Sequence, residues 1–321
     1  VNKMIEMTLR RRSRFSAGLM AKESVSFAGL NASVDSWDSD PDNDVTTAPV
    51  EYSTDTRNDH GSVASTKVDN SAVLLNQASV WGYVYTGGAA PQVGTHGSIT
   101  GRDTPTGVQI DPNRVATDFT ADFPMLTAPI DGVPIATIGA TLGTPGAATK
   151  WRCNGISLNG NQTLTILGDV TLILTVGSGA HALDVTGNGS IIVPEGSSLT
   201  VYVEGDVMIA GKGLANKNIR PISFQLLSTN NSPGGQSIQV AGNGALRSVV
   251  YAPNADVKIN GNGDVMGAVV ARNITLTGNA YFHYDESLAR SASDTPFGVQ
   301  DWRELTSDTA RAAHAAKFAG W

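Results

Sequence analysis

The sequence predicts an all-β protein built as a parallel β-helix (β-solenoid), in one or two solenoid segments, with a short helix near the C-terminus. Three observations predict this fold: Gly-Asn corners that recur between short alternating strands, much glycine with little charge, and few aromatic residues. The 321 residues include 35 glycines, 16% charged residues and 6% aromatic residues, where about 7% glycine and 25% charge are usual. This composition favours many inward-facing positions on stacked strands.

The repeated unit is a short alternating strand, a Gly-Asn corner and a second alternating strand. Alternation with a period of two places one set of side chains inside and the other outside. Glycine and asparagine take positive φ most readily, so the chain can turn there. Corners separated by 19 residues (Gly242 to Gly261) and 17 residues (Gly261 to Gly278) have the spacing of stacked coils. The copies are residues 156–164, 185–191, 238–246, 257–265, 274–282 and, in degraded form, 25–34.

A β-sandwich is the competing fold, because residues 169–176 and 198–204 could also form long hairpin arms. A sandwich pairs strands with their sequence neighbours through hairpin turns. The regular spacing of the corners favours the solenoid.

Composition also divides the chain into four parts. They are residues 1–110, an Asp- and Ser-rich solenoid-like β region; 111–149, a connector rich in proline and glycine; 150–290, the C-terminal β-solenoid; and 291–321, a tail. Within the tail, the Ala-rich residues 307–318 predict a short helix with Ser307 or Thr306 as N-cap. That helix could cap the last coil.

Charge, cysteine content and hydropathy exclude several classes of protein. A net charge of −7 disfavours nucleic acid as a partner, since phosphate binding needs clustered Lys and Arg. The single Cys153 excludes an internal disulfide framework and a Cys-based zinc site, and we expect a buried or inert thiol. No window approaches the roughly 18 apolar residues of a membrane helix. We therefore expect membrane attachment only through a segment absent from this sequence.

The sharpest polar feature is the acidic stretch 35–44. EF-hand spacing places aspartates at positions 1, 3 and 5 and a glutamate at position 12, but Val45 replaces the glycine that position 6 requires. The four candidate Ca²⁺ ligands are Asp40, Asp42, Asp44 and Glu51. A solvated acidic turn is the alternative, so we expect no cofactor and keep Ca²⁺ as an open candidate.

No set of residues predicts a catalytic site. His283 and Asp285 share a face of an alternating strand and could serve acid–base chemistry. A hydrogen-bonded strand end that closes the solenoid is the simpler interpretation. A polysaccharide-degrading solenoid would need two carboxylates in one groove, whereas Asp256, Asp264 and Glu204 fall on outward positions of different coils.

Residues 1–9 form an alternating strand with no committed partner in the sequence. A strand with free edges can pair with another chain. We therefore predict self-association through Val1, Met4, Ile5, Met7 and Leu9. The arginines that follow, between residues 10 and 14, could contact an anionic membrane or charge a solvated strand edge.

Two runs in the C-terminal repeats carry a resemblance to a known family. Tyr-Ala-Pro-Asn at 251–254 and His-Tyr-Asp-Glu-Ser-Leu at 283–288 resemble the C-terminal β-solenoid domain of bacterial envelope proteins described as type IV pilus assembly or pilin-like proteins. Residues 34–39 and 59–65 resemble the N-terminal part of the same proteins. The coil pattern is more distantly similar to that of bactofilins, which polymerise by stacking β-helices. The motif residues, expected to be structural, are Tyr251, Pro253, Asn254, His283, Tyr284, Asp285 and Glu286.

The resemblance implies a non-enzymatic structural protein of the bacterial cell surface that forms, or forms part of, an extracellular pilus-like filament. The expected partners are further copies of the chain, as a homo-oligomer or filament, or other pilus and envelope proteins. Family members usually begin with a hydrophobic N-terminal helix, which this sequence lacks. The alternatives are a Ca²⁺-dependent or carbohydrate-binding adhesive module and a β-helix polysaccharide-degrading enzyme.

Overall fold

The structure is a computed structural model that describes residues 4–11, 13–29, 31–44, 46–177, 180–210, 213–242, 246–261, 263–291 and 297–312. This part of the chain contains 24 strands, three short 3-10 helices and one α-helix, α1 (Asp308–Ala312). The predicted all-β class is confirmed. Among these residues, no helix is long and apolar enough to cross a membrane.

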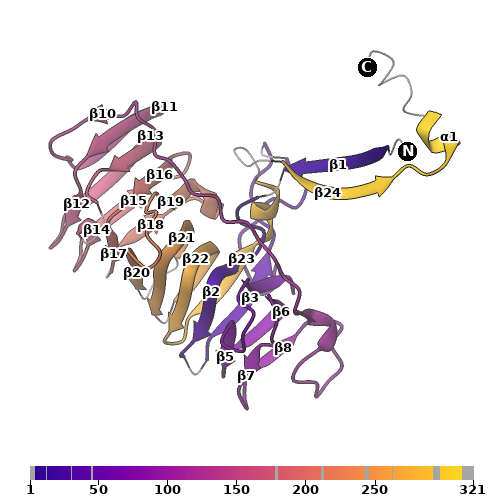
Figure 1. The fold of residues 1–321 in the computed structure, drawn as a ribbon. Coiled ribbons are helices and arrows are strands. Elements are labelled where there is room, and N and C mark those ends of the chain that lie inside the picture. The colour runs from indigo at the N-terminus through magenta and orange to yellow at the C-terminus, as the bar shows by residue number, and fades with distance from the viewer. Residues whose placement is uncertain are drawn as a thin grey trace.

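The strands wind into coils that stack through three parallel ladders, which we call faces A, B and C (Figure 1). Face A runs, from one end of the stack to the other, through β10 (Val133–Pro134), β11 (Thr141–Cys153), β13 (Thr163–Leu174), β16 (Ser198–Val203), β19 (Phe224–Ser228), β21 (Leu246–Gly261), β22 (Asp264–Thr277), β2 (Leu19–Phe27), β4 (Gly61–Ser65), β6 (Ser79–Thr86) and β9 (Val115–Ala116).

The other two faces use the remaining strands and other segments of the long ones. Face B contains β11, β13, β15 (Ser190–Val193) and β18 (Leu214–Asn216) and, further along, β21, β22, β23 (Tyr281–Asp285), β3 (Ser33–Trp37), β6 and β8 (Ser98–Thr100). Face C contains β12 (Ile156–Leu158), β14 (His181–Val185), β17 (Asp206–Ile209), β20 (Ser237–Gly242), β21, β22, β2, β5 (Val73–Asn76) and β7 (Gln92–Val93).

Parallel pairing decides between the two folds considered for residues 169–176 and 198–204. Residues 169–174 of β13 pair in parallel with residues 198–203 of β16. Hairpin arms would pair antiparallel, so the sandwich interpretation of these two segments is wrong.

Alternation builds the interior, as the sequence predicted. Along face A, the inward column is fully apolar, and its members in register are Leu172, Val201, Leu226, Val250, Val269, Leu19, Val63 and Val84, all buried. The Gly-Asn corners also form as expected, since Gly160 and Gly187 have φ of 58° and 64°. Asn188 Nδ2 donates to Asn161 Oδ1 on the neighbouring coil at 3.3 Å.

Spatial order in the stack differs from the order of the chain. On face B, β22 pairs with β23, and on faces A and C it pairs with β2, so β23 and β2 belong to one coil. β3 then pairs with the other edge of β23. The expectation that β23 closes the solenoid is therefore wrong, because the N-terminal half continues the stack from that coil.

A strap, residues 117–132, joins the two ends of the stack along the outside of face A (Figure 1). Its contacts cross the coils in chain order: Phe119 stacks on Tyr85 at 5.9 Å, Lys22 Nζ lies 5.6 Å from the Phe123 ring, the Tyr251 hydroxyl donates to the Pro124 carbonyl at 2.9 Å, and Arg152 donates to the Ile130 carbonyl. The strap covers outward apolar side chains of face A, which explains why both sides of β21 and β22 are buried there.

The connector predicted at 111–149 is shorter in the structure. β9 already begins at Val115, and β11 begins at Thr141. The Gly-Thr-Pro-Gly run looked like a loop because residues between Gly143 and Ala148 bulge out of β11, with Gly143 and Gly146 at φ of 98° and 70°. On both sides of this bulge, β11 stays paired with β13.

A two-stranded antiparallel arm, β1 (Ile5–Arg11) and β24 (Phe297–Glu304), projects from the stack (Figure 1). The expectation that the first strand lacks a partner within the chain is therefore wrong. The α1 helix lies at the outer end of the arm, not on a coil, and the Ser307 hydroxyl accepts from the Ala310 N–H at 3.2 Å as the predicted N-cap. Val1, residues 313–318 of the predicted helix and the Leu9 side chain lie outside the described part.

Candidate functional site

The residues singled out by the sequence gather at the junction between the C-terminal and N-terminal halves of the stack. There β3 pairs residue for residue with β23, which places Asp35 beside His283. His283 Nδ1 lies 2.5 Å from Asp35 Oδ1, and both side chains are buried. The Tyr52 hydroxyl donates to Asp35 Oδ2 at 2.9 Å, and Arg57 Nε lies 2.7 Å from the same oxygen.

The Asp35 carboxylate is therefore the acceptor that holds three side chains together. The Tyr52 ring also stacks on the His283 ring, with centroids 3.7 Å apart. Burial, and then the nearby Asp35 charge, raise the pKa of Tyr52 well above its ordinary value, so Tyr52 stays a hydrogen-bond donor. The outer ring nitrogen of His283, Nε2, lies 3.4 Å from Oδ1 of the half-exposed Asp264.

The rest of the His-Tyr-Asp-Glu motif joins the same two halves. Asp285 is fully buried and accepts from the Ser39 N–H, the Ser39 hydroxyl and the Ser287 N–H at 2.7–3.1 Å. Burial raises the pKa of the Asp285 carboxyl despite these donors. The Tyr284 hydroxyl donates to the Phe15 carbonyl, and Glu286 accepts from the Ser36 hydroxyl. Apart from the local bond from Ser287, these contacts link β23, or the 3-10 helix that follows it, to the N-terminal half.

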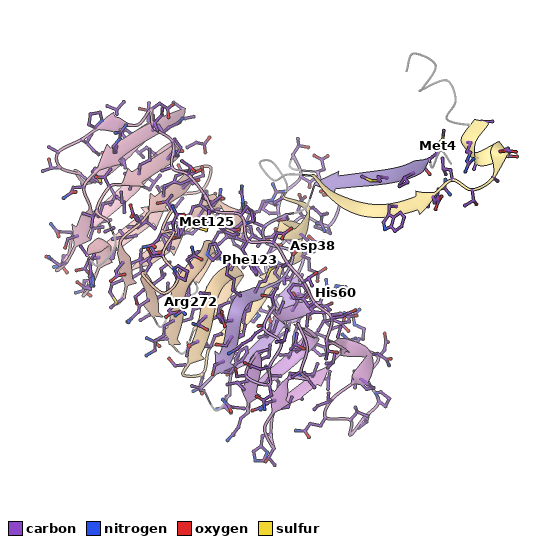
Figure 2. The ribbon with its side chains drawn as sticks, viewed as in Figure 1. Met4, Asp38, His60, Phe123, Met125 and Arg272 are labelled. Carbon is purple, nitrogen blue, oxygen red and sulfur yellow. The ribbon has the colours of Figure 1, made fainter. Side chains whose placement is uncertain are left out.

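The Tyr-Ala-Pro-Asn run holds the strap. Besides the Tyr251 bond to Pro124, Asn254 accepts from Lys22 Nζ at 2.8 Å and directs its amide toward Met125 Sδ at 3.3 Å. Buried Pro253 lies where the register of β21 and β22 shifts, between Ala252 and Asp256, a position that needs no ladder hydrogen bond. Figure 2 shows Phe123 and Met125 where the strap crosses the middle of the stack.

The acidic loop forms ion pairs with the C-terminal half. Asp38 binds Arg290 at 2.7 Å, Asp40 lies 3.2 Å from Arg220, and Glu51 binds Arg247 at 2.5 Å. The other two candidate ligands, Asp42 and Asp44, are exposed and accept hydrogen bonds within the loop itself. Among residues outside the masked gaps, no group of three His, Cys, Asp or Glu side chains could hold a metal ion. The structure does not bring the four candidate Ca²⁺ ligands together.

Calcium is therefore expected to leave thermal stability unchanged. Two of the four carboxylates already have arginine partners, so Ca²⁺ would have to displace a guanidinium from each. We expect the melting temperature to agree within error in 5 mM CaCl₂ and in 5 mM MgCl₂, measured by circular dichroism. A rise with Ca²⁺ alone would restore the EF-hand hypothesis, because a ligand that binds the folded state raises its stability.

The scattered carboxylates lie on different sides of the coil. Asp256 starts the face C segment of β21 and pairs with Arg272 at 2.7 Å, whereas Asp264 starts the face B segment of β22. Glu204 follows β16 of face A. These three residues do not share a groove, which a pair of glycosidase carboxylates requires.

A row of rings on the outer side of β6 was not predicted from the sequence. His60, Tyr83, Tyr85 and Phe119 stack in succession with centroids 5.9–6.3 Å apart. Buried Arg114 lies over Tyr83 and binds Asp59 at 2.6 Å. The alternating aromatic residues at 81, 83 and 85 were the signal that this outer surface is covered.

Cys153 is buried, as expected, and burial raises the pKa of its thiol. The thiol is therefore held in its protonated, less reactive form.

A family model and three chains of solved structures are similar to this chain. A family model described as "Domain of unknown function (DUF7305)" matches residues 155–291, which include all seven motif residues. One similar structure is the DUF3494 domain of a Shewanella frigidimarina ice-binding protein, with 13% identity, a TM-score of 0.32, and coverage of 89% of this chain and 99% of that one. Another is an ice-binding protein, LeIBP, from an Arctic yeast, with 12% identity, a TM-score of 0.28, and coverage of 89% and 97%. No curated protein matches.

Proposed function

We propose that this chain is a non-enzymatic structural protein of the bacterial cell surface. In this proposal it folds as a parallel β-helix and self-associates into, or forms part of, an extracellular pilus-like filament. The observation that carries the proposal is the continuous ladder of face A, in which eleven strands from both halves of the chain form one rod. At about 4.8 Å per strand step, the rod spans about 48 Å.

The roles of the buried polar groups support this proposal. Asp35, His283 and Asp285 are bound by side chains or backbone of the other half of the chain. Asn254 binds Lys22 and reaches the strap. These groups are all buried, and they hold segments together.

The end of the stack at β10 and β12 offers a surface for self-association. In the part of the chain that the structure describes, β10 pairs only with β11, and β12 pairs only with β14. Nearby, Ile130 and Val133 are 88% and 54% exposed. Free strand edges beside apolar side chains favour pairing with another chain.

Self-association of the full chain is expected to rise with concentration. Light scattering after size exclusion and negative-stain electron microscopy would measure it. Val133→Asp at the stack end should weaken association at least tenfold, which corresponds to about 1.4 kcal/mol. Val68→Asp is the matched control, since Val68 is 69% exposed and lies between β4 and β5, far from β10 in the stack. A wild-type protein that stays monomeric at every concentration would refute the proposed function.

A further inference from the structure

Two Asn-Gly pairs flank β12 at one end of the stack. Asn154-Gly155 comes directly before the strand, and Asn159-Gly160 comes directly after it. Among the described strands β12 pairs only with β14, and Figure 1 shows β10, β11 and β12 at this end of the stack. All four residues of the two pairs are exposed. Water therefore reaches both pairs.

An Asn-Gly pair can modify itself without an enzyme or an oxidant. Glycine has no Cβ, so its backbone nitrogen is easily approached and its backbone adapts to a five-membered ring. This nitrogen attacks the side-chain carbonyl carbon of the asparagine, and the C–N bond of the side-chain amide breaks. The amide nitrogen leaves as ammonia and takes the proton of the glycine N–H. Water then opens the resulting succinimide to aspartate or isoaspartate.

The other two Asn-Gly pairs that the structure fully describes are held by the fold. Gly189, which follows Asn188, is buried and donates its N–H to the Thr186 carbonyl at 2.9 Å. Asn260 and Gly261 lie inside β21 and pair with β20, and Asn260 Oδ1 accepts from the Thr277 hydroxyl. A nitrogen or amide held in this way must lose its hydrogen bond before it can react, and that loss costs free energy.

The reacting atoms of the two pairs beside β12 are not held. Within the described part of the chain, neither Gly155 nor Gly160 donates its N–H to an acceptor, and the side-chain amides of Asn154 and Asn159 make no hydrogen bond. The bonds found there use the Asn154 carbonyl and the backbone N–H and carbonyl of Asn159. These atoms neither attack nor leave in the reaction.

We propose that Asn154 and Asn159 are sites of spontaneous deamidation, which places negative charge at the end of the stack. Each conversion replaces a neutral amide with a carboxylate that is ionised at neutral pH. The consequence for assembly rests on the proposed function, in which exposed Ile130 and Val133 at the same end contact another chain. An unpaired charge is costly to bury in such a contact. Deamidation therefore limits how long this end can associate.

Peptide mapping by mass spectrometry tests the two sites. The full chain is incubated at mildly alkaline pH, and fragmentation spectra locate each converted residue. We expect Asn154 and Asn159 to convert at least ten times faster than Asn188 and Asn260. The control is the same incubation in urea, where all four should convert at similar rates because each precedes a glycine. Equal rates at the four residues of the folded protein, or no conversion at Asn154 and Asn159, would overturn the inference.

Two double variants test the effect on assembly. Asn154→Asp with Asn159→Asp introduces both charges, whereas Asn154→Gln with Asn159→Gln keeps both amides and would have to close a slower, six-membered ring. We expect the Asp variant to weaken association at least tenfold in light scattering after size exclusion, and the Gln variant to associate like the wild type.

The outcomes distinguish this inference from the proposed function. If the wild type associates and the Asp variant associates equally, the effect of deamidation on assembly is refuted while the proposed function stands. If the wild type never associates, the proposed function fails, and the mass spectra still decide whether Asn154 and Asn159 are deamidation sites.

Discussion

Deleting residues 127–131 from the strap is expected to prevent the stack from closing. From Ala116 to Val133 the strap and its ends comprise 17 residue steps, which reach at most about 60 Å at about 3.5 Å each. The ten strand steps between β9 and β10 require about 48 Å. Removing five residues leaves twelve steps, or about 42 Å, which is too short. One end of the stack must then separate from the coil beneath it.

We expect this deletion to lower the free energy of unfolding by about 4 kcal/mol or more, the range reached when buried structure is lost. Urea unfolding followed by circular dichroism would measure the change. The matched control inserts five Gly and Ser residues after Thr127, which lengthens the strap and should change stability by less than about 1 kcal/mol. Equal stability of the deletion variant and the wild type would show that the length of the strap does not limit closure of the stack.

Replacing Asp35 with alanine is expected to be the most damaging point substitution at the junction. The change removes the acceptor for His283 and the Tyr52 hydroxyl and the charge beside Arg57. Breaking a buried, hydrogen-bonded pair by removing one partner destabilises proteins by about 3–5 kcal/mol. Because Arg57 is partly exposed and can turn to water, we expect a loss of about 3 kcal/mol.

Tryptophan fluorescence during urea unfolding reports this change, since buried Trp37 lies on the same strand as Asp35. Asp264→Ala is the control. Asp264 is half-exposed, and its contact with His283 Nε2 is long, at 3.4 Å. We expect the control to change stability by about 0.5 kcal/mol or less. If both variants lose the same stability, the Asp35–His283 pair is not what holds the two halves together.

Local pattern accounts for the parts of the fold that were predicted correctly. Alternation identified inward positions such as Leu164, Ile191 and Val257, all buried. The Gly-Asn corners form at Gly160 and Gly187 because a positive φ suits these residue types. The N-cap of α1 was likewise readable, since capping depends on residues within one turn.

Distance along the chain explains what was missed at the candidate site. The acidic loop resembled an EF-hand because its spacing is local, yet Glu51 pairs with Arg247, 196 residues away. The β1 strand looked unpaired because its partner, β24, lies near the other end of the chain. No periodicity in either segment encodes these contacts.

By itself, the sequence determined the all-β class, the coil unit with its inward columns, and the identity of the motif residues. Tertiary structure alone decided that the N-terminal half stacks on β23, that the strap returns along face A, and that the motif residues hold these segments. The physical reason is that alternation fixes which side of a strand is apolar. Alternation does not specify what each side of a strand contacts. In β21, Val250 faces the interior, whereas the next residue, Tyr251, contacts the distant strap.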